Sequence, residues 1–208
     1  MTVSADTPRA TRMPRSARRA QLLVAARQIF VNQGYHAAAM DDIAVRAGIS
    51  KPVLYQHFPS KLDLYLALLD SGAEEIIALM RDALASTRDN RTRVTRAVEA
   101  YFEFVNDSAE TFRLLFETDL FNEAAVRERV QHTDNECAKL LVDVIAEDTG
   151  IGEDEALMLA FGLIGMAQTS AVRWLRDGRR IPRDKAAWLV SRMAWRGISG
   201  FPRSAETK

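Results

Sequence analysis

Residues 34–61 read GYHAAAMDDIAVRAGISKPVLYQHFPSK, and this stretch decides the fold of the N-terminal part of the chain. Two short amphipathic segments lie on either side of Gly48-Ile49-Ser50, which predicts two short helices joined by a tight turn. Ser50 can cap the second helix, and Pro52 falls in its first turn, where a missing N–H group costs little. These parts make a helix-turn-helix. The second helix of such a unit fits the major groove of B-DNA.

The second short helix supplies most of the candidate DNA contacts. Leu54 and Phe58 are expected to face inward, which leaves the other side chains for DNA. These candidates are Ser50, Lys51, Pro52, Val53, Tyr55, Gln56, His57 and, just beyond the helix, Lys61. Gln56 can bind an adenine edge or a phosphate, and Val53 can touch a thymine methyl group. Tyr55, His57 and Lys61 suit phosphates.

The charge distribution points to the same part of the chain. The 208 residues carry 28 basic and 28 acidic side chains, so the net charge is zero. Residues 1–61, however, hold nine Lys or Arg and three Asp, a net charge of +6. Phosphate binding requires local positive charge rather than a basic average. A polyanion would therefore bind in the N-terminal third, although a solvated charged tail would give the same composition.

Hydrophobic periodicity predicts an all-α fold of about nine helices. The expected helices cover about 16–34, 40–47, 51–58, 61–86, 94–105, a short segment from 108, 122–150, 153–177 and 183–199. Gly34 is expected to end the first helix, and Ser60-Lys61-Leu62-Asp63 forms a capping box at the start of the fourth. The expected domains are a disordered arm at 1–14, a helix-turn-helix domain at 15–61, a helical effector-binding and dimerisation domain at 62–202, and a tail at 203–208.

Other classes of protein lack support in the sequence. Cys137 is the single cysteine, so no internal disulfide can form. His132 and Glu136 share a helical face that Cys137 does not, so we expect no metal site. The sequence shows no arrangement of catalytic residues and no phosphate-binding loop, so we expect neither an enzyme nor a cofactor. A helical adaptor that binds only other proteins is a further alternative, but it would leave the basic helix-turn-helix unexplained. The best membrane candidate is 156–167, twelve residues without a charge, and it is too short to cross a membrane. The first twenty residues do not form a signal peptide, and together these features predict a cytoplasmic protein.

The DNA-binding stretch resembles the signature of the TetR family. The matching run is Ile43-Ala44, Ala47-Gly48-Ile49-Ser50, Leu54-Tyr55-Gln56-His57-Phe58, Ser60-Lys61 and Leu64. The resemblance implies a homodimeric transcription factor in which a long fourth helix leads to a helical ligand domain and the last two helices pair two subunits. Ala39 departs from the Ser or Thr that often caps the second helix in this family, although Asp41 and Asp42 still favour a helix start there. Pro52 departs from the usual small residue, and this should alter base contacts.

Segments along most of the chain are similar to actinobacterial regulators of fatty-acid synthase genes. They are Gly34-Tyr35-His36-Ala37-Ala38, residues 50–58, Asp89-Asn90-Arg91, residues 113–117, residues 162–166 and Ala194-Trp195-Arg196-Gly197. This resemblance implies a long-chain acyl-CoA effector and an operator near lipid-synthesis genes. The alternative within the family is a drug- or lipid-responsive repressor of an efflux or degradation operon.

Aromatic and aliphatic residues of the second domain are the candidates for an effector pocket. They are Tyr101, Phe104, Phe112, Leu115, Phe116, Phe121, Leu141, Phe161, Gly165 and Met166. Such residues at helical spacing also make an ordinary core, and the family resemblance favours the pocket. Phosphates of coenzyme A would need basic residues at its mouth, and Arg113, Arg127, Arg129 and Arg173 are candidates, with ordinary surface charges as the alternative.

The last two predicted helices are the candidate dimer interface. The residues expected there are Leu157, Phe161, Ile164, Ala171, Trp174, Trp188 and Trp195. Closing the core of one subunit is the alternative role for these residues. In the predicted mechanism two recognition helices bind adjacent major-groove segments, and a small apolar effector favours an arrangement with the wrong spacing. The expected partners are thus double-stranded operator DNA, a second copy of the chain and this effector, with no membrane.

Overall fold

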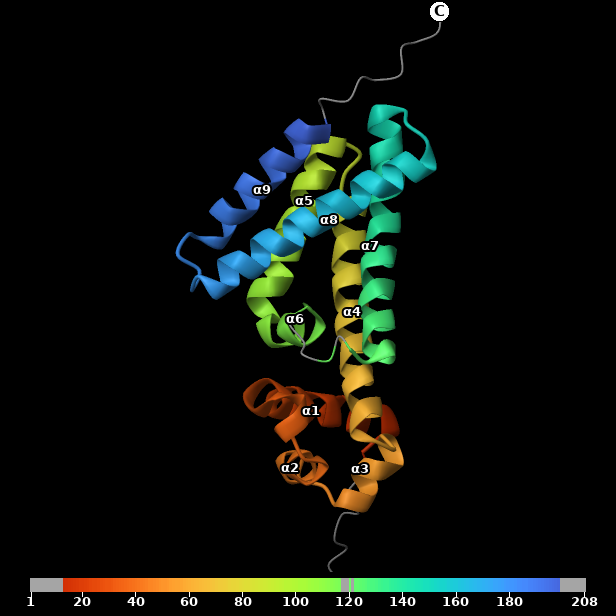
Figure 1. Ribbon diagram of the computed structural model, residues 1–208, viewed down its shortest axis with the longest axis vertical. Helices are drawn as coiled ribbons and strands as arrows, with labels where there is room; N and C mark the ends of the chain where they lie inside the picture. The colour runs from red at the N-terminus through yellow and green to blue at the C-terminus, as the bar shows by residue number, and fades with distance from the viewer. Residues whose placement is uncertain (1–12, 117–119, 121, 199–208) are drawn as a thin grey trace, which may run out of the picture. The chain divides into compact units, whose positions relative to one another are not determined.

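The computed structural model describes residues 13–116, 120 and 122–198, and within them the chain forms nine α-helices and no strand (Figure 1). The helices are α1 (Arg15–Ala37), α2 (Met40–Arg46), α3 (Lys51–His57), α4 (Lys61–Ala85), α5 (Asn90–Asp107), α6 (Ala109–Phe116), α7 (Ala124–Thr149), α8 (Glu153–Arg176) and α9 (Arg183–Ile198). The predicted all-α fold is confirmed. The predictions for residues 1–12, Phe121 and the tail at 203–208 lie outside the described residues.

The chain divides into two compact units, an N-terminal unit of residues 1–65 and a C-terminal unit of residues 66–208. The division falls inside α4 rather than at its start. The helix therefore begins in the N-terminal unit and continues without a break into the C-terminal unit.

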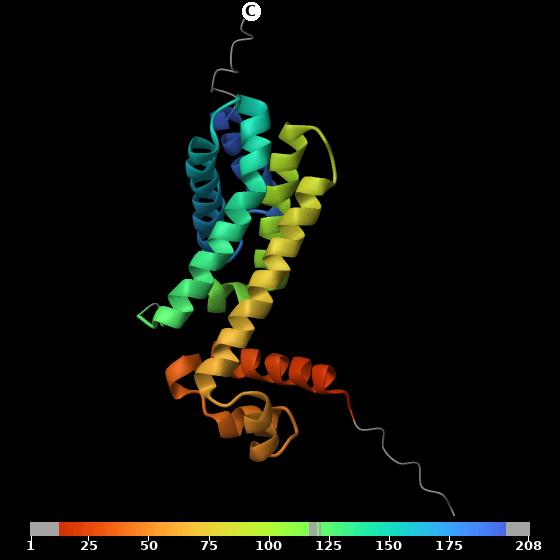
Figure 2. The same ribbon diagram turned by 90° about the vertical axis from the view of Figure 1, so that its right-hand side faces the viewer.

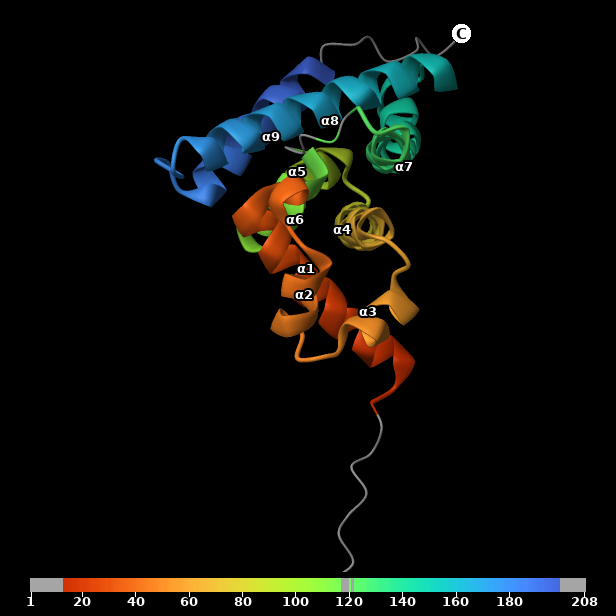
Figure 3. The same ribbon diagram turned by 60° about the horizontal axis from the view of Figure 1, so that its bottom comes forward.

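Helices α1, α2 and α3 of the N-terminal unit pack around an apolar core (Figure 3). The buried side of α1 follows from four-residue spacing, which places side chains on one helical face. Gly34 breaks α1 near its end with a φ of +76°, a left-handed conformation that glycine adopts without steric cost. Residues that are 2% exposed or less in this core are Leu22, Ala26, Phe30, Ile43, Leu54, Phe58, Leu64 and Tyr65.

Hydrogen bonds at three helix starts test the predicted caps. The Ser60 hydroxyl accepts a bond from the Asp63 N–H group at 3.1 Å and donates to the Asp63 carboxylate at 2.7 Å, so Ser60 caps α4 as predicted. The Ser50 side chain makes no capping bond to α3, and this prediction is wrong. Asp89, in a stretch that shows no helical period, caps α5 by accepting a bond from the Thr92 N–H group at 2.9 Å.

Helix α5 lies at the centre of the C-terminal unit, where it packs against α7, α8 and α9. Figures 1 and 2 show α8 crossing α5 and α7, with α9 returning beside α5. A left-handed Gly150, with a φ of +74°, ends α7 before the turn into α8. Trp174 of α8 stabilises the end of this layer, because its ring centroid lies 5.7 Å from that of Phe102 and its Nε1 donates to the Ile181 carbonyl at 2.8 Å.

Helix α8 has nearly the bounds predicted for it, 153–177. An 18-residue window of α8 has a mean hydropathy of 1.4, which by length and composition alone would allow it to cross a membrane, as it would for the core helix of many proteins that do not. Its buried residues recur every three or four positions, as on a helix that covers a protein core. They are Ala156, Ala160, Ile164, Ala167, Ala171 and Trp174. The outward side carries large apolar side chains, including Met158 and Phe161.

Candidate DNA-binding interface

Helix α3 has one buried side and one open side. Leu54 is fully buried within α3, and Phe58, which follows the helix, is 1% exposed, as the spacing predicts. Lys51, Pro52, Tyr55 and Gln56 are exposed, whereas Val53 and His57 are half-buried, and Ser50 is exposed before the helix. The predicted contact residues of α3 therefore share an accessible surface.

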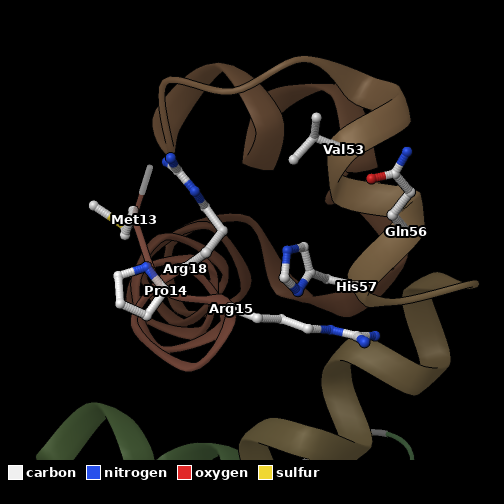
Figure 4. A pocket seen from close by; sticks show the side chains of 7 residues that line it. All are labelled: Met13, Pro14, Arg15, Arg18, Val53, Gln56 and His57. Carbon is white, nitrogen blue, oxygen red and sulfur yellow. The ribbon is translucent and has the colours of Figure 1, made fainter. Parts of the chain in front are cut away.

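A hollow of about 710 Å³ lies between the start of α1 and α3 (Figure 4). Its walls are Met13, Pro14, Arg15, Arg18, Val53, Gln56 and His57. In the view of Figure 4 the His57 ring lies between the side chains of Arg15 and Arg18. Helix α1 thus brings two guanidinium groups beside the recognition face of α3, an arrangement suited to a phosphate.

The electrostatics of the hollow reflect these arginines. Partial burial lowers the pKa of His57 below its ordinary 6.5, and the positive charges of Arg15, Arg19 and Arg18 lower it further. His57 is therefore neutral at pH 7, and the arginines carry the positive charge. Helical periodicity does not select Arg15 and Arg18 as contacts, and the sequence signal that includes them is the +6 charge of residues 1–61.

Lys61 has a different role from the predicted phosphate contact. Its Nζ donates hydrogen bonds to the carbonyl oxygens of Tyr35 at 2.7 Å, Ala38 at 2.9 Å and His36 at 3.2 Å. Nζ also lies 4.5 Å from the centroid of the Tyr35 ring. An ammonium group has three donors, and here all three are used within the protein. These contacts favour a structural role for Lys61, which ties the start of α4 to the end of α1, over the predicted phosphate contact.

Lys51 is also paired, although it remains on the surface. Its Nζ lies 2.8 Å from Oδ1 of Asp41 at the start of α2, and this hydrogen-bonded pair raises the pKa of Lys51. Both side chains are more than half exposed. A DNA phosphate would have to compete with Asp41 for this lysine, which reduces the net gain from such a contact.

A second candidate site is a small apolar cavity inside the C-terminal unit. Its volume is about 30 Å³. A cavity of this size holds roughly one water molecule, whereas pockets for organic ligands measure roughly 300–1,000 Å³. A larger ligand must therefore widen it. The lining residues are Met80, Val94, Ala97, Val98, Tyr101, Leu141, Leu163, Ile164, Ala167 and Ala194.

The structure brings together only part of the predicted effector pocket. Tyr101 and Leu141 line the cavity. Phe112 is buried next to Tyr101, with ring centroids 6.3 Å apart, and Phe104 lies 6.4 Å from Phe112. Met166 packs beside the cavity against Val94 and Ala194. Sequence reasoning missed the small residues Ala97, Ala167 and Ala194, which mark the close helix approaches around the cavity.

The remaining predicted pocket residues lie elsewhere. Phe161 is 38% exposed on the outward side of α8 and is not among the described residues that line the cavity, because other positions form the inward side of α8. Gly165 is half-buried and does not line the cavity. The side chains of Leu115, Phe116 and Phe121 lie outside the described residues.

The four predicted arginines do not surround the cavity. None of Arg113, Arg127, Arg129 and Arg173 is among the described lining residues. Arg129 Nε lies 3.3 Å from Asp70 Oδ1 on α4, and Arg173 Nε donates to Asp177 at 2.8 Å. These two side chains therefore act in ion pairs on the surface of the C-terminal unit.

Titratable groups of α7 lie close to Tyr101. Burial raises the pKa of Asp134 from 3.8 to about 6, and burial raises the pKa of the Cys137 thiol to about 12. Burial also raises the pKa of the Tyr101 hydroxyl well above 10, and the charges of Asp134 and Cys137 add to this rise. No group of three metal-ligating side chains is found in the part of the chain that the structure describes.

Replacing Asp134 with Asn is expected to stabilise the protein in a pH-dependent way. The folded state raises the pKa of this acid, so ionised Asp134 costs stability above about pH 6, and the cost disappears as the pH falls below 4. Because the carboxyl group is only partly buried, we expect a gain of about 1–2 kcal/mol at pH 8 and almost none at pH 4. Urea unfolding at both pH values measures this, and an equal gain at both would contradict it.

The predicted interface residues fall into two groups. Ile164, Ala171 and Trp174 are 7% exposed or less within one subunit, which favours for these three residues the alternative role of closing the core. They belong to the inward stripe of α8. Phe161 and Trp188 are exposed, and Leu157 and Trp195 are half-buried. The sequence missed two other outward residues, Met158 and Met193, because apolar residues lie on both sides of these helices.

Known proteins resemble this chain along most of its length. Residues 22–68 match the family described as bacterial regulatory proteins, tetR family. The HTH-type transcriptional activator FasR of Mycolicibacterium smegmatis is 45% identical over 194 residues, which cover 93% of this chain and 89% of that protein. A solved TetR-like transcriptional regulator from Rhodococcus sp. RHA1 is 29% identical with a TM-score of 0.74, covering 91% of this chain and 100% of that one.

A further solved relative shows the fold alone. FadR from Bacillus subtilis, in complex with stearoyl-CoA, has a TM-score of 0.71 at 16% identity and covers 88% of this chain and 98% of that one. The likeness to FasR, by contrast, combines high identity with nearly complete coverage of both chains. The chain therefore belongs to the TetR family of DNA-binding transcriptional regulators, which are not enzymes.

Proposed function

We propose that this regulator binds operator DNA with the open side of α3 and the arginines of the adjoining hollow. The observation that supports this most strongly is the presence of Arg15 and Arg18 beside Gln56 and His57 in one concave surface. Gln56, Tyr55 and Val53 are proposed to meet bases or nearby phosphates, and the arginines to hold the backbone. Phosphate contacts fix position, whereas base contacts specify sequence. A regulator that binds operator DNA works where the chromosome is, which supports the predicted cytoplasmic location.

Replacing both Arg15 and Arg18 with Ala should reduce the salt dependence of DNA binding. In a plot of the logarithm of the binding constant against the logarithm of the salt concentration, each phosphate contact contributes about −0.9 to the slope. We therefore expect the slope to become less steep by about 2 for a mixed-sequence duplex, measured by fluorescence anisotropy at several salt concentrations. Arg88→Ala, which removes an exposed cation between α4 and α5, is the control. An unchanged slope in the double variant would exclude the hollow as a phosphate site.

We propose that a small apolar effector enters the C-terminal unit by widening the cavity. The proposed effector is a long-chain acyl-CoA, and the proposed target genes are those of lipid synthesis. The cavity lining supports an apolar ligand, because nine of its ten described residues have side chains without oxygen or nitrogen. The resemblance of several segments to regulators of fatty-acid synthase genes supports an effector from lipid metabolism, and FadR of Bacillus subtilis, which has the same fold, was solved with stearoyl-CoA. The small cavity volume means that bound and free states must differ in helix packing.

That difference in packing would allow regulation. Met80 of α4 lines the cavity, and α4 begins at Lys61 in the N-terminal unit. A ligand that separates the cavity walls prefers a state with a shifted α4 and can change DNA binding only by the extent of this preference. The proposed mechanism is therefore a population shift between a closed state and a widened state.

Varying the acyl chain tests the effector. Affinity should rise with chain length by up to about 0.8 kcal/mol per buried methylene group and level off once the widened cavity is full. We expect short-chain acyl-CoA and free coenzyme A to leave DNA binding unchanged, and chains of fatty-acid length to change it, in a competition assay at fixed operator concentration. Equal effects of free coenzyme A and long-chain acyl-CoA would remove acyl-CoA as the effector and favour the efflux or degradation regulator.

We also propose that the outward sides of α8 and α9 form the homodimer interface. The supporting observation is a set of large apolar side chains that remain 38–70% exposed in one subunit, namely Met158, Phe161, Trp188, Leu189 and Met193. Large contiguous apolar surface on a single subunit is typical of an interaction site. A symmetric pairing of the two helices with those of a second copy would cover it.

A further inference from the structure

Tyr101 is the one residue with a polar side-chain atom among the described residues that line the apolar cavity. Tyr101 is 5% exposed, and its hydroxyl oxygen is buried without a hydrogen-bond partner among the residues that the structure describes. The other described lining residues are Val, Ala, Leu, Ile and Met, none of which has a polar side-chain atom that could bind this hydroxyl. A buried hydroxyl without a partner destabilises a protein relative to phenylalanine, so this group calls for a physical explanation.

We propose that the Tyr101 hydroxyl donates a hydrogen bond to the carbonyl oxygen of an acyl thioester when the cavity widens around it. This inference rests on the proposed effector and adds the polar contact that would distinguish an acyl chain from plain hydrocarbon. An apolar pocket gains affinity from hydrocarbon, whereas a single placed donor selects for one functional group. The contact would pair a hydroxyl that has no partner within the described part of the chain.

The surroundings of Tyr101 favour a neutral acceptor over a charged one. Burial raises the pKa of this hydroxyl well above 10, so it stays protonated and can donate at any physiological pH. Asp134 lies near enough for its charge to contribute to that rise, and the pKa of Asp134 is about 6, so it is mostly ionised at pH 7.5. A fatty-acid carboxylate in the same place would be repelled by Asp134, whereas an uncharged thioester carbonyl would not.

Paired ligands that differ only in the carbonyl group test this contact. Hexadecanoyl-CoA contains the carbonyl, and S-hexadecyl-CoA is the thioether that lacks it. In calorimetric titrations of the full-length protein, Tyr101→Phe is expected to weaken binding of hexadecanoyl-CoA about 5- to 10-fold, the range for one neutral hydrogen bond, and to leave S-hexadecyl-CoA unchanged. Wild-type protein should prefer the thioester over the thioether by a similar factor, and palmitate should bind more weakly than hexadecanoyl-CoA.

A control and the contrary outcomes separate this inference from the proposed effector. Tyr65→Phe removes a tyrosine hydroxyl from the N-terminal unit and should bind both ligands as the wild type does. Tyr101→Phe keeps the aromatic ring, and thermal unfolding should show a protein at least as stable as the wild type. If the wild type binds hexadecanoyl-CoA and Tyr101→Phe binds it equally well, or loses both ligands equally, the hydrogen bond is absent. If the wild type binds neither ligand, the proposed effector is wrong and the inference fails with it.

Discussion

Replacing Lys61 with Met is expected to lower the free energy of unfolding of the N-terminal unit by about 3 kcal/mol, because hydrogen bonds to a charged group are each worth about 1.5–3 kcal/mol and do not add fully. The substitution keeps the apolar stem and removes the ammonium group that donates to the carbonyls of Tyr35, His36 and Ala38. These carbonyls belong to the segment that fixes the start of α2. Urea unfolding followed by circular dichroism measures the loss, and DNA affinity should fall with the folded population.

Lys51→Met is the matched control for this prediction. It also removes a lysine ammonium group, but one whose partner Asp41 is exposed, so its stability should change by less than about 1 kcal/mol. If Lys61→Met unfolds like Lys51→Met and loses DNA affinity only, then Lys61 contacts phosphate as the sequence pattern suggests. A large loss of stability at Lys61 alone supports the structural role.

Replacing Phe161 with Arg is expected to abolish the proposed dimer at micromolar concentration while leaving each subunit folded. Phe161 is 38% exposed in one subunit, so Arg can be accommodated on the free surface of α8. In a symmetric dimer both copies would bury an unpaired guanidinium group, and an uncompensated buried charge costs about 3–5 kcal/mol. Sedimentation velocity should show wild-type dimers and variant monomers, with circular dichroism unchanged.

Val24→Arg is the control for the interface prediction, because Val24 is a similarly exposed apolar residue on α1. It should sediment as the wild type does. A wild-type protein that is monomeric at this concentration would contradict the proposed dimer, and a Phe161→Arg protein that remains dimeric would move the interface away from Phe161. Met158→Arg, at a side chain that is 70% exposed on the same helix, then shows whether another part of α8 is involved.

Element boundaries and the helix-turn-helix followed from local features of the chain. The capping box of Ser60 and Asp63, the left-handed Gly34 and the turn at Gly48 act over a few residues, so the sequence contains all the information that places them. The spacing of Leu54 and Phe58 likewise determined which side of α3 is open. Local rules failed at Ser50, which has the right residue type for a cap but no capping bond.

Roles that depend on long-range contacts could not be read from spacing. On α8 apolar residues occur on both sides, so periodicity could not separate the inward Ile164 and Trp174 from the outward Met158 and Phe161. The sequence analysis assigned too many residues to the effector pocket for a similar reason. Aromatic residues that fill a core and aromatic residues that line a cavity occur at the same helical spacing. Only the packing of α5 against its neighbours showed that the free volume is about 30 Å³ and lies beside Tyr101.

The sequence by itself determined the all-α architecture, the helix-turn-helix and the family, because helix periodicity, caps and a motif of about 25 residues are properties of neighbouring positions. The tertiary structure decided what individual charged and aromatic side chains do. Lys61 turned inward to three carbonyl groups from residues at least 23 positions away, and Arg15 and Arg18 came to lie beside Gln56 and His57. Such partners are set by how helices pack, and a long flexible side chain can serve either DNA or its own fold until that packing places an acceptor within reach.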